Sequence, residues 1–209
     1  MIVGTSHFDG NIVILGLARS GMATARALMA GGNQILAWDD SPERLKTAAQ
    51  AGIPVNNGPD FDWRGIAALV PSPGIPLKHP TMVAARTAGV EIFGDVEILW
   101  RTMSERQFVG ITGTNGKSTT TALIGHILKH ARETVQIGGN LGTPALSLDA
   151  LRAEGTYVLE MSSFQLDLTP TVSFDIAVLL NITPDHLDRH STMNAYITAK
   201  RNIFRPGRL

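Results

Sequence analysis

Residues 110–120 place glycines, a lysine and hydroxyl side chains in the order that holds phosphate groups in proteins. An apolar, β-branched run at 107–112 leads into them, and a helical pattern at 117–131 follows. Glycines let backbone N–H groups approach phosphate oxygens, and the helix N-terminus adds partial positive charge. The lysine supplies a full charge for the β- and γ-phosphates, and the next hydroxyl is placed to ligate Mg²⁺. The stretch therefore predicts a nucleotide phosphate loop formed by Gly113, Thr114, Asn115, Gly116, Lys117, Ser118 and Thr119.

This loop departs from the strict phosphate-loop pattern at one position, because Ile111 stands where the first glycine is expected. Gly113, Gly116, Lys117 and Ser118 keep their places at a strand-to-helix junction. The alternative interpretation is a glycine turn before an ordinary helix, with a solvated lysine.

Two other strand ends carry groups that suit a divalent ion. Glu160 ends an apolar run, and a carboxylate there, in a sheet that also carries a phosphate loop, suits Mg²⁺. Residues 181–188 follow another apolar run and gather Asp185, His186 and Asp188, which could ligate a metal. A helix-capping segment and a polar turn are the respective alternatives.

The first hundred or so residues carry turns that suit a nucleotide-like ligand. The turn at 16–21 resembles a dinucleotide fingerprint, but Ala18 replaces the middle glycine, which weakens an interpretation as an NAD site. Asp39 and Asp40 follow the next strand, near the distance expected for a carboxylate that contacts a ribose or base. The turn at 72–76 lies at another strand end, although a rigid turn explains it equally well.

Two further features carry weaker signals. The glycines at 138–142 could admit a phosphate or diphosphate. Lys200 lies in a helical pattern at 193–204 and, from the residues alone, is a solvated lysine.

Composition limits the class of protein. The 209 residues are 44% hydrophobic and 17% charged, which is typical of a globular protein with a sizeable core. Their formal net charge is zero, so bulk charge suggests neither nucleic-acid nor membrane binding. Cysteine is absent, which excludes disulfides and thiolate metal sites. We find no signal-peptide pattern and no apolar run of about 18 residues, so we expect a soluble cytoplasmic protein.

Strand and helix patterns alternate along the chain, which predicts parallel α/β sheets. Strands are expected at 11–16, 34–38, 53–55, 66–70 and 90–93, with helices at 19–30, 43–51 and 81–88. A break between 94 and 107, with a connecting helix at 95–102, precedes a second set of strands at 107–112, 156–161 and 175–180. The last of these is continuously apolar, which is typical of a strand covered on both faces. We therefore predict a Rossmann-like parallel-sheet domain at 1–95 and a partial P-loop ATPase-type central domain at 96–209.

Taken together, these motifs resemble those of the Mur ligases of peptidoglycan synthesis. Residues 113–119 (Gly-Thr-Asn-Gly-Lys-Ser-Thr) look like the ATP loop of that family. Residues 160–166 (Glu-Met-Ser-Ser-Phe-Gln-Leu) are similar to its D-glutamate-adding branch in particular, and residues 181–188 match its strand-end motif. The turns at 16–21 and 72–76 look like its uridine-sugar-binding turns. The resemblance covers essentially the whole chain.

The resemblance implies an ATP-dependent ligase that adds D-glutamate to UDP-N-acetylmuramoyl-L-alanine through an acyl phosphate, as a monomer in the cytoplasm. It implies that Lys117 and Ser118 hold the ATP phosphates and Mg²⁺, that Glu160 and His186 ligate Mg²⁺, and that Lys200 matches a lysine that the family carbamylates. The implied substrate contacts are Leu17, Ala18, Arg19, Ser20, Asp39, Asp40, Ser72, Pro73, Gly74, Asn140, Ser162 and Gln165.

The family also has a C-terminal α/β domain that closes over ATP and binds the amino acid. Leu209 follows a helix partway through the central domain, so we expect a truncated chain that does not ligate by itself. Two alternatives stay open at this point: a non-catalytic protein that binds UDP-sugars or nucleotides, and a nicotinamide-dependent oxidoreductase built on the turn at 16–21. Binding without turnover would favour the first, and nicotinamide binding without ATP binding would favour the second.

Overall fold

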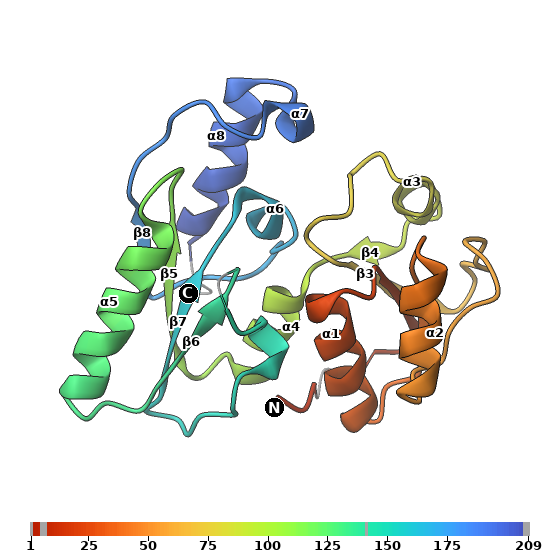
Figure 1. Ribbon diagram of the computed structural model, residues 1–209, viewed down its shortest axis with the longest axis horizontal. Helices are drawn as coiled ribbons and strands as arrows, with labels where there is room; N and C mark the ends of the chain where they lie inside the picture. Colours follow the sequence, from red (N-terminus) through yellow and green to blue (C-terminus); the bar gives the residue numbers. More distant parts are fainter. Residues whose placement is uncertain (1, 5–7, 141, 207–209) are drawn as a thin grey trace.

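The structure is a computed structural model that describes residues 2–4, 8–140 and 142–206. Its described strands form two sheets of four strands each, with the orders β2-β1-β3-β4 and β6-β7-β5-β8. Every strand pair in both sheets is parallel. The sheets lie side by side in two halves of the molecule, with α4 between them (Figure 1). This confirms the predicted α/β class with parallel sheets.

The N-terminal half alternates strands and helices. The strands are β1 (Asn11–Leu15), β2 (Ile35–Trp38), β3 (Ile66–Pro71) and β4 (Glu91–Ile92). The helices are α1 (Arg19–Ala30), α2 (Pro42–Gln50) and α3 (Pro80–Thr87). Ser41 caps α2 by accepting a hydrogen bond from the Arg44 N–H, and Pro42 takes the first helical position, where its missing N–H costs nothing.

The second half follows the connecting helix α4 (Asp95–Met103). Its strands are β5 (Gln107–Thr112), β6 (Val135–Gly139), β7 (Thr156–Glu160) and β8 (Ile176–Leu179). Its helices are α5 (Lys117–His130), α6 (Ser163–Leu166), α7 (Leu187–His190) and α8 (Met193–Arg201), with 3₁₀ turns η1 (Ala145–Ser147) and η2 (Asn202–Phe204). No helix in the described part of the chain has the length and apolarity that a membrane crossing requires.

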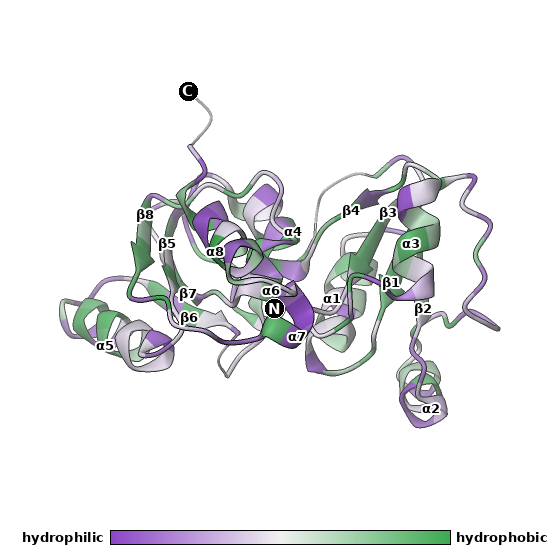
Figure 2. Cartoon of the chain, turned by 90° about the horizontal axis from the view of Figure 1, so that it is seen from above, coloured by the Kyte–Doolittle hydropathy of each residue, from purple (hydrophilic) through white to green (hydrophobic). Residues whose placement is uncertain are grey.

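Burial of apolar side chains on both faces of the central strands stabilises the two halves. Strand β7 is buried at every position, and β1 is buried at all but its first. Strands β1 and β3 are coloured as hydrophobic, whereas the helices around them carry both hydrophobic and hydrophilic residues (Figure 2). Close packing selects small residues: a Cβ on Gly125 of α5 would come within 2.1 Å of the Ile137 side chain on β6. Glycine therefore lets α5, the helix that follows the phosphate loop, lie directly on the sheet.

Most predicted elements are confirmed within a residue or two. The expected strand at 53–55 is reduced to an isolated bridge between Ala37 and Val55. Strand β6 was not predicted, because its sequence ends in two glycines that look like a loop. Pairing with β7 along its whole length makes it a strand, so tertiary context overrides local propensity.

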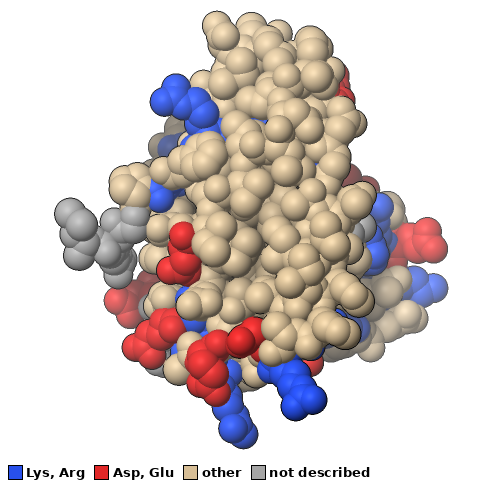
Figure 3. Space-filling model, turned by 90° about the vertical axis from the view of Figure 1, so that its left-hand side faces the viewer, with Lys and Arg blue, Asp and Glu red and all other residues tan. Residues whose placement is uncertain are grey.

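The prediction that β8 is covered on both faces is wrong. Among the described strands β8 pairs only with β5, and Ile176 is 58% exposed. Leu123 and Ile127 on α5 are each 55% exposed on the same side of the molecule. This side has few charged groups across its middle (Figure 3). A continuous apolar run therefore indicated a parallel strand correctly but did not establish its burial.

The connecting helix begins with a carboxylate in an apolar environment. Asp95 is 3% exposed, its Oδ1 accepts the Val96 N–H, and its Oδ2 is buried without a hydrogen-bond partner among the described residues. Burial raises the pKa of Asp95 from 3.8 to about 6. The folded protein must therefore bury an ionised carboxylate above pH 6, which opposes folding there.

We expect Asp95→Asn to stabilise the chain increasingly as pH rises. Because the folded pKa lies above the unfolded one, the penalty is absent below about pH 4 and complete above about pH 6, where it approaches about 3 kcal/mol. From pH 5 to pH 8, the difference in unfolding free energy between variant and wild type should grow by about 1.5 kcal/mol in urea titrations. Asp60→Asn, at an exposed carboxylate, is the control. A difference that does not grow with pH would contradict this account.

Candidate functional site

The sequence motifs lie on loops that leave the carboxyl ends of strands. In each sheet the chain places later strands on both sides of its first strand, which creates a switch point between β1 and β3 and another between β5 and β8. Open α/β sheets bind ligands in the crevices that such switch points create. The turn at 16–21 follows β1, the turn at 72–76 follows β3, the phosphate loop follows β5, and residues 181–188 follow β8.

The first turn is held tightly against its neighbours. Gly16 has a φ of +91°, and a Cβ on Gly21 would lie 1.8 Å from the Gly16 carbonyl oxygen. Only glycine fits at position 21. Because it has no side chain there, α1 can begin directly over the turn. The Ser72 hydroxyl donates to the Gly16 carbonyl at 2.9 Å, which joins the turns on the two sides of the switch point.

The Asp39 carboxylate stabilises this turn through hydrogen bonds to backbone N–H groups. Its carboxylate accepts the Leu17 N–H at 2.6 Å and the Ser41 N–H at 2.8 Å, and it lies 3.4 Å from the Arg44 guanidinium. Its oxygens are therefore engaged within the protein, and it is 5% exposed. The neighbouring Asp40 points outward and lies 3.1 Å from the Nε2 of His79.

A cleft of about 440 Å³ opens between the two halves. Its lining includes the predicted residues Ala18, Arg19, Ser20, Ser72, Pro73, Gly74, Asn140 and Gln165. Leu17, Asp39, Asp40 and Ser162 are not among its lining residues, whereas Arg44 and Ile75 line it and were not predicted. Two arginines and no Asp or Glu line this cleft in the described part of the chain, so its charge favours an anion.

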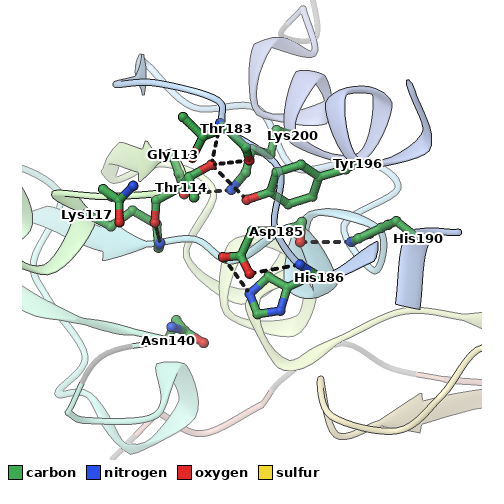
Figure 4. A network of polar contacts seen from close by, with 12 residues as sticks. Gly113, Thr114, Lys117, Asn140, Thr183, Asp185, His186, His190, Tyr196 and Lys200 are labelled. Carbon is green, nitrogen blue, oxygen red and sulfur yellow. Dashed lines mark hydrogen bonds and ion pairs between the residues drawn. The ribbon is translucent and has the colours of Figure 1, made fainter. Parts of the chain in front are cut away.

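The phosphate loop is fixed by backbone conformation and by the strand-end segment beside it. Gly116 has a φ of +83° immediately before α5, a left-handed conformation that glycine adopts without strain. The Asn181 side chain accepts the Asn115 N–H at 2.9 Å and donates to the Asn115 carbonyl at 3.1 Å. The Thr114 hydroxyl accepts the Thr183 N–H at 3.0 Å. These contacts fix the loop on its β8 side (Figure 4).

The lysine of the loop folds back over it. The Lys117 Nζ donates to the Thr114 carbonyl at 2.7 Å. Beside it, the Ser118 hydroxyl donates to Glu160 at 2.7 Å, and the Asn140 amide donates to the other Glu160 oxygen at 2.8 Å. Glu160 is 2% exposed, so a buried carboxylate joins the first turn of α5 to the strand end of β6.

Lys200 is a buried lysine, contrary to the solvated side chain that its residue type alone suggested. It is 1% exposed, and its Nζ donates to the Gly113 carbonyl at 2.7 Å and to the Thr112 hydroxyl at 3.3 Å. Burial and, to a smaller extent, the charge of Lys117 lower the pKa of Lys200 to about 8, against an opposing effect of Asp185. The nitrogen also lies 4.8 Å from the ring centroid of Tyr196.

His186 lies at the opening of this site, in left-handed backbone with a φ of +51°. Its Nε2 lies 3.5 Å from Asp185, and the two side chains are 50% and 44% exposed (Figure 4). Its ring is 5.0 Å from that of Phe164. In the described residues, no group of three or more His, Cys, Asp or Glu side chains converges as a protein-only metal site. His186 and Glu160 thus do not form a complete metal cage.

Two of the expected substrate contacts lie at α6: Ser162 is its N-cap, and Gln165 lies within the helix. The Ser162 hydroxyl accepts the Gln165 N–H, and the Gln165 side chain accepts the Ser162 N–H, which forms a capping box. His190 supports the helix from below, with its Nε2 2.9 Å from the Ser163 hydroxyl. Burial lowers the pKa of His190, and the charges of Arg189, His186 and Lys200 lower it further.

Besides Arg44 and Ile75, sequence reasoning missed four residues of the site: Asn181, Arg189, His190 and Tyr196. The Tyr196 hydroxyl lies 3.1 Å from that of Thr114, and the tyrosine is 1% exposed. Asn181 lies in segment 181–188, and Arg189 directly follows it. That segment was selected from the sequence for its carboxylates and its imidazole. A buried polar partner leaves no periodic signal in a single sequence, so only the fold reveals these contacts.

Comparisons with known proteins agree with this arrangement. Residues 10–94 match the family described as Mur ligase MurD-like, N-terminal domain, and residues 111–208 match the Mur ligase middle domain. The chain is 55% identical over 203 residues to a UDP-N-acetylmuramoylalanine–D-glutamate ligase of Rhodospirillum rubrum, which covers 93% of this chain and 43% of the relative. It is 48% identical over 213 residues to the ligase of that name from Phenylobacterium zucineum, which covers 97% of this chain and 45% of the relative.

The chain thus spans less than half the length of these relatives. Among solved structures, a UDP-N-acetylmuramate:L-alanyl-γ-D-glutamyl-meso-diaminopimelate ligase from Neisseria meningitides matches with a TM-score of 0.56 at 19% identity, over 93% of this chain and 67% of that one. This structural match supports the fold alone. Because both halves match Mur ligase domains and the identity to the curated relatives extends across them, the chain belongs to the Mur ligase family.

Proposed function

We propose that the protein acts in the ATP-dependent addition of D-glutamate to UDP-N-acetylmuramoyl-L-alanine, a step of peptidoglycan synthesis that serves cell-wall growth, cell shape and division. The observation that carries this proposal is that two nucleotide-type turns and Asn140 line one cleft with two arginines, while Glu160 joins Asn140 to Ser118 of the phosphate loop. The names of the relatives support the identity of the substrates. Family membership argues against the oxidoreductase alternative.

The chemistry requires two steps, because a carboxylate is a poor acyl donor. A carboxylate oxygen of the alanyl group attacks the γ-phosphorus of ATP, and ADP leaves. The amine of D-glutamate then attacks the acyl carbon, and phosphate leaves from the tetrahedral intermediate. Lys117 is placed to move from the Thr114 carbonyl to the phosphates and to offset the charge that develops on them.

Magnesium fits the residues beside the loop. The Ser118 hydroxyl and the buried Glu160 carboxylate already contact each other, and Mg²⁺ is commonly held by one or two carboxylates together with substrate phosphates and waters. We propose that Ser118 and Glu160 hold the ion and that His186 contributes from the opposite strand end. When bound, the ion would neutralise phosphate charge.

The substrate's UDP group is assigned to the N-terminal half. We propose that the backbone of the turn at 16–21, with Arg19, Ser20 and the Ser72–Gly74 turn, contacts the diphosphate and nucleoside. The Asp39 carboxylate supports Leu17 in that turn, and we assign the exposed Asp40, which lies 3.1 Å from the His79 Nε2, to the nucleoside. Asn140 is assigned to the substrate near its phosphates, Ser162 and Gln165 to its muramoyl part, and Gly113, Asn115, Gly116 and Thr119 to ATP.

These assignments divide the chain into a UDP-sugar domain at 1–95 and an ATP-binding domain at 96–209. We propose that the reaction takes place in the cytoplasm, because it uses ATP and a soluble UDP-sugar. The proposal takes the protein to act as a monomer, since residues from both halves of one chain line the cleft.

We also propose that Lys200 is carbamylated. Its neutral amine would attack the carbon of CO₂ and lose a proton, which turns a cation into an anion and leaves one N–H to donate to the Gly113 carbonyl. A pKa of about 8 supplies the neutral amine that this reaction requires. The resulting carbamate would lie beside the phosphate loop, where it could help to bind a metal ion.

Carbamylation makes a pH-dependent prediction. In ¹³C-bicarbonate, NMR should detect a protein carbamate whose occupancy rises from pH 7 to pH 9, because the neutral fraction of Lys200 rises through its pKa of about 8. Exposed lysines, with pKa values of about 10.4, stay almost fully charged over this range. Lys200→Met should remove the signal, and Lys129→Ala should keep it. Absence of a carbamate at pH 9 would refute the assignment.

The proposed reaction is tested by positional isotope exchange in ATP with the full-length protein. Exchange should require UDP-N-acetylmuramoyl-L-alanine and should not require D-glutamate, because acyl phosphate formation precedes amine attack. ADP formation at the same rate without the UDP substrate would exclude this mechanism. Binding of both ligands without any exchange would instead favour a protein that binds UDP-sugars and nucleotides without catalysis.

A further inference from the structure

The strand-end segment 181–190 contacts both proposed ligand sites. At its beginning, Asn181 and Thr183 hold the phosphate loop through Asn115 and Thr114. At its end, the Arg189 guanidinium crosses to the N-terminal half and donates from Nη1 to the carbonyl of Ile75. Ile75 follows Ser72-Pro73-Gly74, the turn assigned to the UDP group. One short segment therefore joins the two turns that bind phosphate groups.

Arg189 is held in place from more than one side. Its guanidinium lies 4.4 Å above the Phe164 ring, which is the centre of the α6 capping segment. The same ring lies 5.0 Å from His186 and 5.6 Å from His190. The flat guanidinium can stack on Phe164 and donate sideways to Ile75 at the same time, which a lysine ammonium cannot reproduce.

The burial of Arg189 opposes folding, so this arginine differs from an ordinary charged residue on the surface. Its Nε and Nη2 are buried and have no hydrogen-bond partner among the described residues. Buried donors without partners oppose folding, so their retention in a native structure calls for an explanation. The contacts to Phe164 and Ile75 supply one: they fix the N-terminal turn relative to the loop that holds ATP.

We propose that Arg189 is a positioning residue that couples binding of the UDP-sugar to binding of ATP. Ordering of the turn at 72–76 by the UDP-sugar fixes Ile75, and Arg189 transmits this restraint along segment 181–190 to the phosphate loop. The second ligand then binds a loop that is already ordered, which gives positive cooperativity. This inference rests on the proposed function, because it needs both ligands to bind.

The test is calorimetry on the full-length protein, with the ATP analogue AMP-PNP and Mg²⁺, in the absence and presence of saturating UDP-N-acetylmuramoyl-L-alanine. In the wild type, the UDP-sugar should tighten AMP-PNP binding about fivefold or more, and by reciprocity AMP-PNP should tighten the UDP-sugar by the same factor. Arg189→Ala should bring this factor close to one, with AMP-PNP affinity in the absence of UDP-sugar changed less than twofold.

The chain offers a matched control. Arg86 donates from Nη1 to the Leu77 carbonyl at 2.8 Å, so it ties down the same loop but from within the N-terminal half. Arg86→Ala should keep the coupling factor of the wild type. Loss of coupling in both variants would show that loop rigidity alone matters and would overturn the role of Arg189.

Two further variants keep the test decisive if Arg189→Ala folds poorly. Arg189→Lys keeps the charge but not the planar stack, and Phe164→Leu removes the ring beneath it; each should lower the coupling factor while melting temperature stays near the wild type. Wild-type coupling in these folded variants would refute the proposal. Failure of the wild type to bind either ligand would instead refute the proposed function, so the two failures are distinguishable.

Discussion

Replacement of Lys117 by alanine should remove most of the affinity for ATP and leave the fold intact. Lys117 begins α5, and its ammonium donates only to the Thr114 carbonyl in the contacts that the structure gives it. Its loss should therefore change the unfolding free energy by less than about 1 kcal/mol. A charge-assisted hydrogen bond to phosphate contributes about 1.5–3 kcal/mol, so AMP-PNP affinity should fall about 10- to 100-fold in calorimetry.

Two companion variants sharpen this prediction. Lys117→Arg should not restore affinity, because a planar fork does not reproduce a compact ammonium inside a closed loop. Lys129→Ala removes an exposed lysine from the last turn of the same helix and should bind AMP-PNP like the wild type. Unchanged affinity in Lys117→Ala would disprove the assignment of the phosphate loop.

The strand ends of the site could be read from the sequence because they follow local rules. Apolar runs, glycine turns and helix starts predicted β5, the loop after it and α5 nearly to the residue. Glu160 was correctly expected at a strand end beside this loop, and it contacts Ser118 directly. Such features repeat over neighbouring positions, so a single sequence carries them.

Contacts between distant residues could not be read in this way. Lys200 resembled a solvated helix residue, yet it is buried because α8 packs it beneath Gly113, far away in the chain. Asp39 was expected to face a ligand, but one of its oxygens accepts the N–H of Leu17, in the turn that follows the neighbouring strand β1. Helical or strand periodicity says which face is buried, not which polar partner lies opposite, so these roles depend on the fold.

The same limit explains the outcome for the metal site. The types and strand-end positions of Glu160 and His186 suggested that they act together. The structure places Glu160 in a buried pair with Ser118 and Asn140, and His186 at the exposed opening beside Asp185. Substrate phosphates and water would have to supply the remaining ligands, as is usual for Mg²⁺. Their joint role therefore remains part of the proposal, and Glu160 is the residue on which it is best tested.

Glu160→Gln should raise the Mg²⁺ concentration needed for nucleotide binding about tenfold or more, and should leave binding of UDP-N-acetylmuramoyl-L-alanine nearly unchanged. The amide keeps the shape of the side chain: its oxygen can accept from Asn140, and its NH₂ can donate to the Ser118 hydroxyl. The fold should survive for this reason, whereas the negative charge that attracts the cation is lost. Hydrogen bonds and attraction that involve a full charge are worth about 1.5–3 kcal/mol, which corresponds to this change in affinity.

The measurement is a magnesium titration of AMP-PNP binding by calorimetry, with UDP-sugar binding recorded in parallel. Glu154→Gln, at an exposed carboxylate just before β7, should leave both titrations unchanged. An equal loss of affinity for AMP-PNP and for the UDP-sugar would indicate a general folding defect and not a role of Glu160 in metal binding. An unchanged magnesium requirement would remove Glu160 from the metal site, because no other buried carboxylate in the described chain contacts the hydroxyl of Ser118.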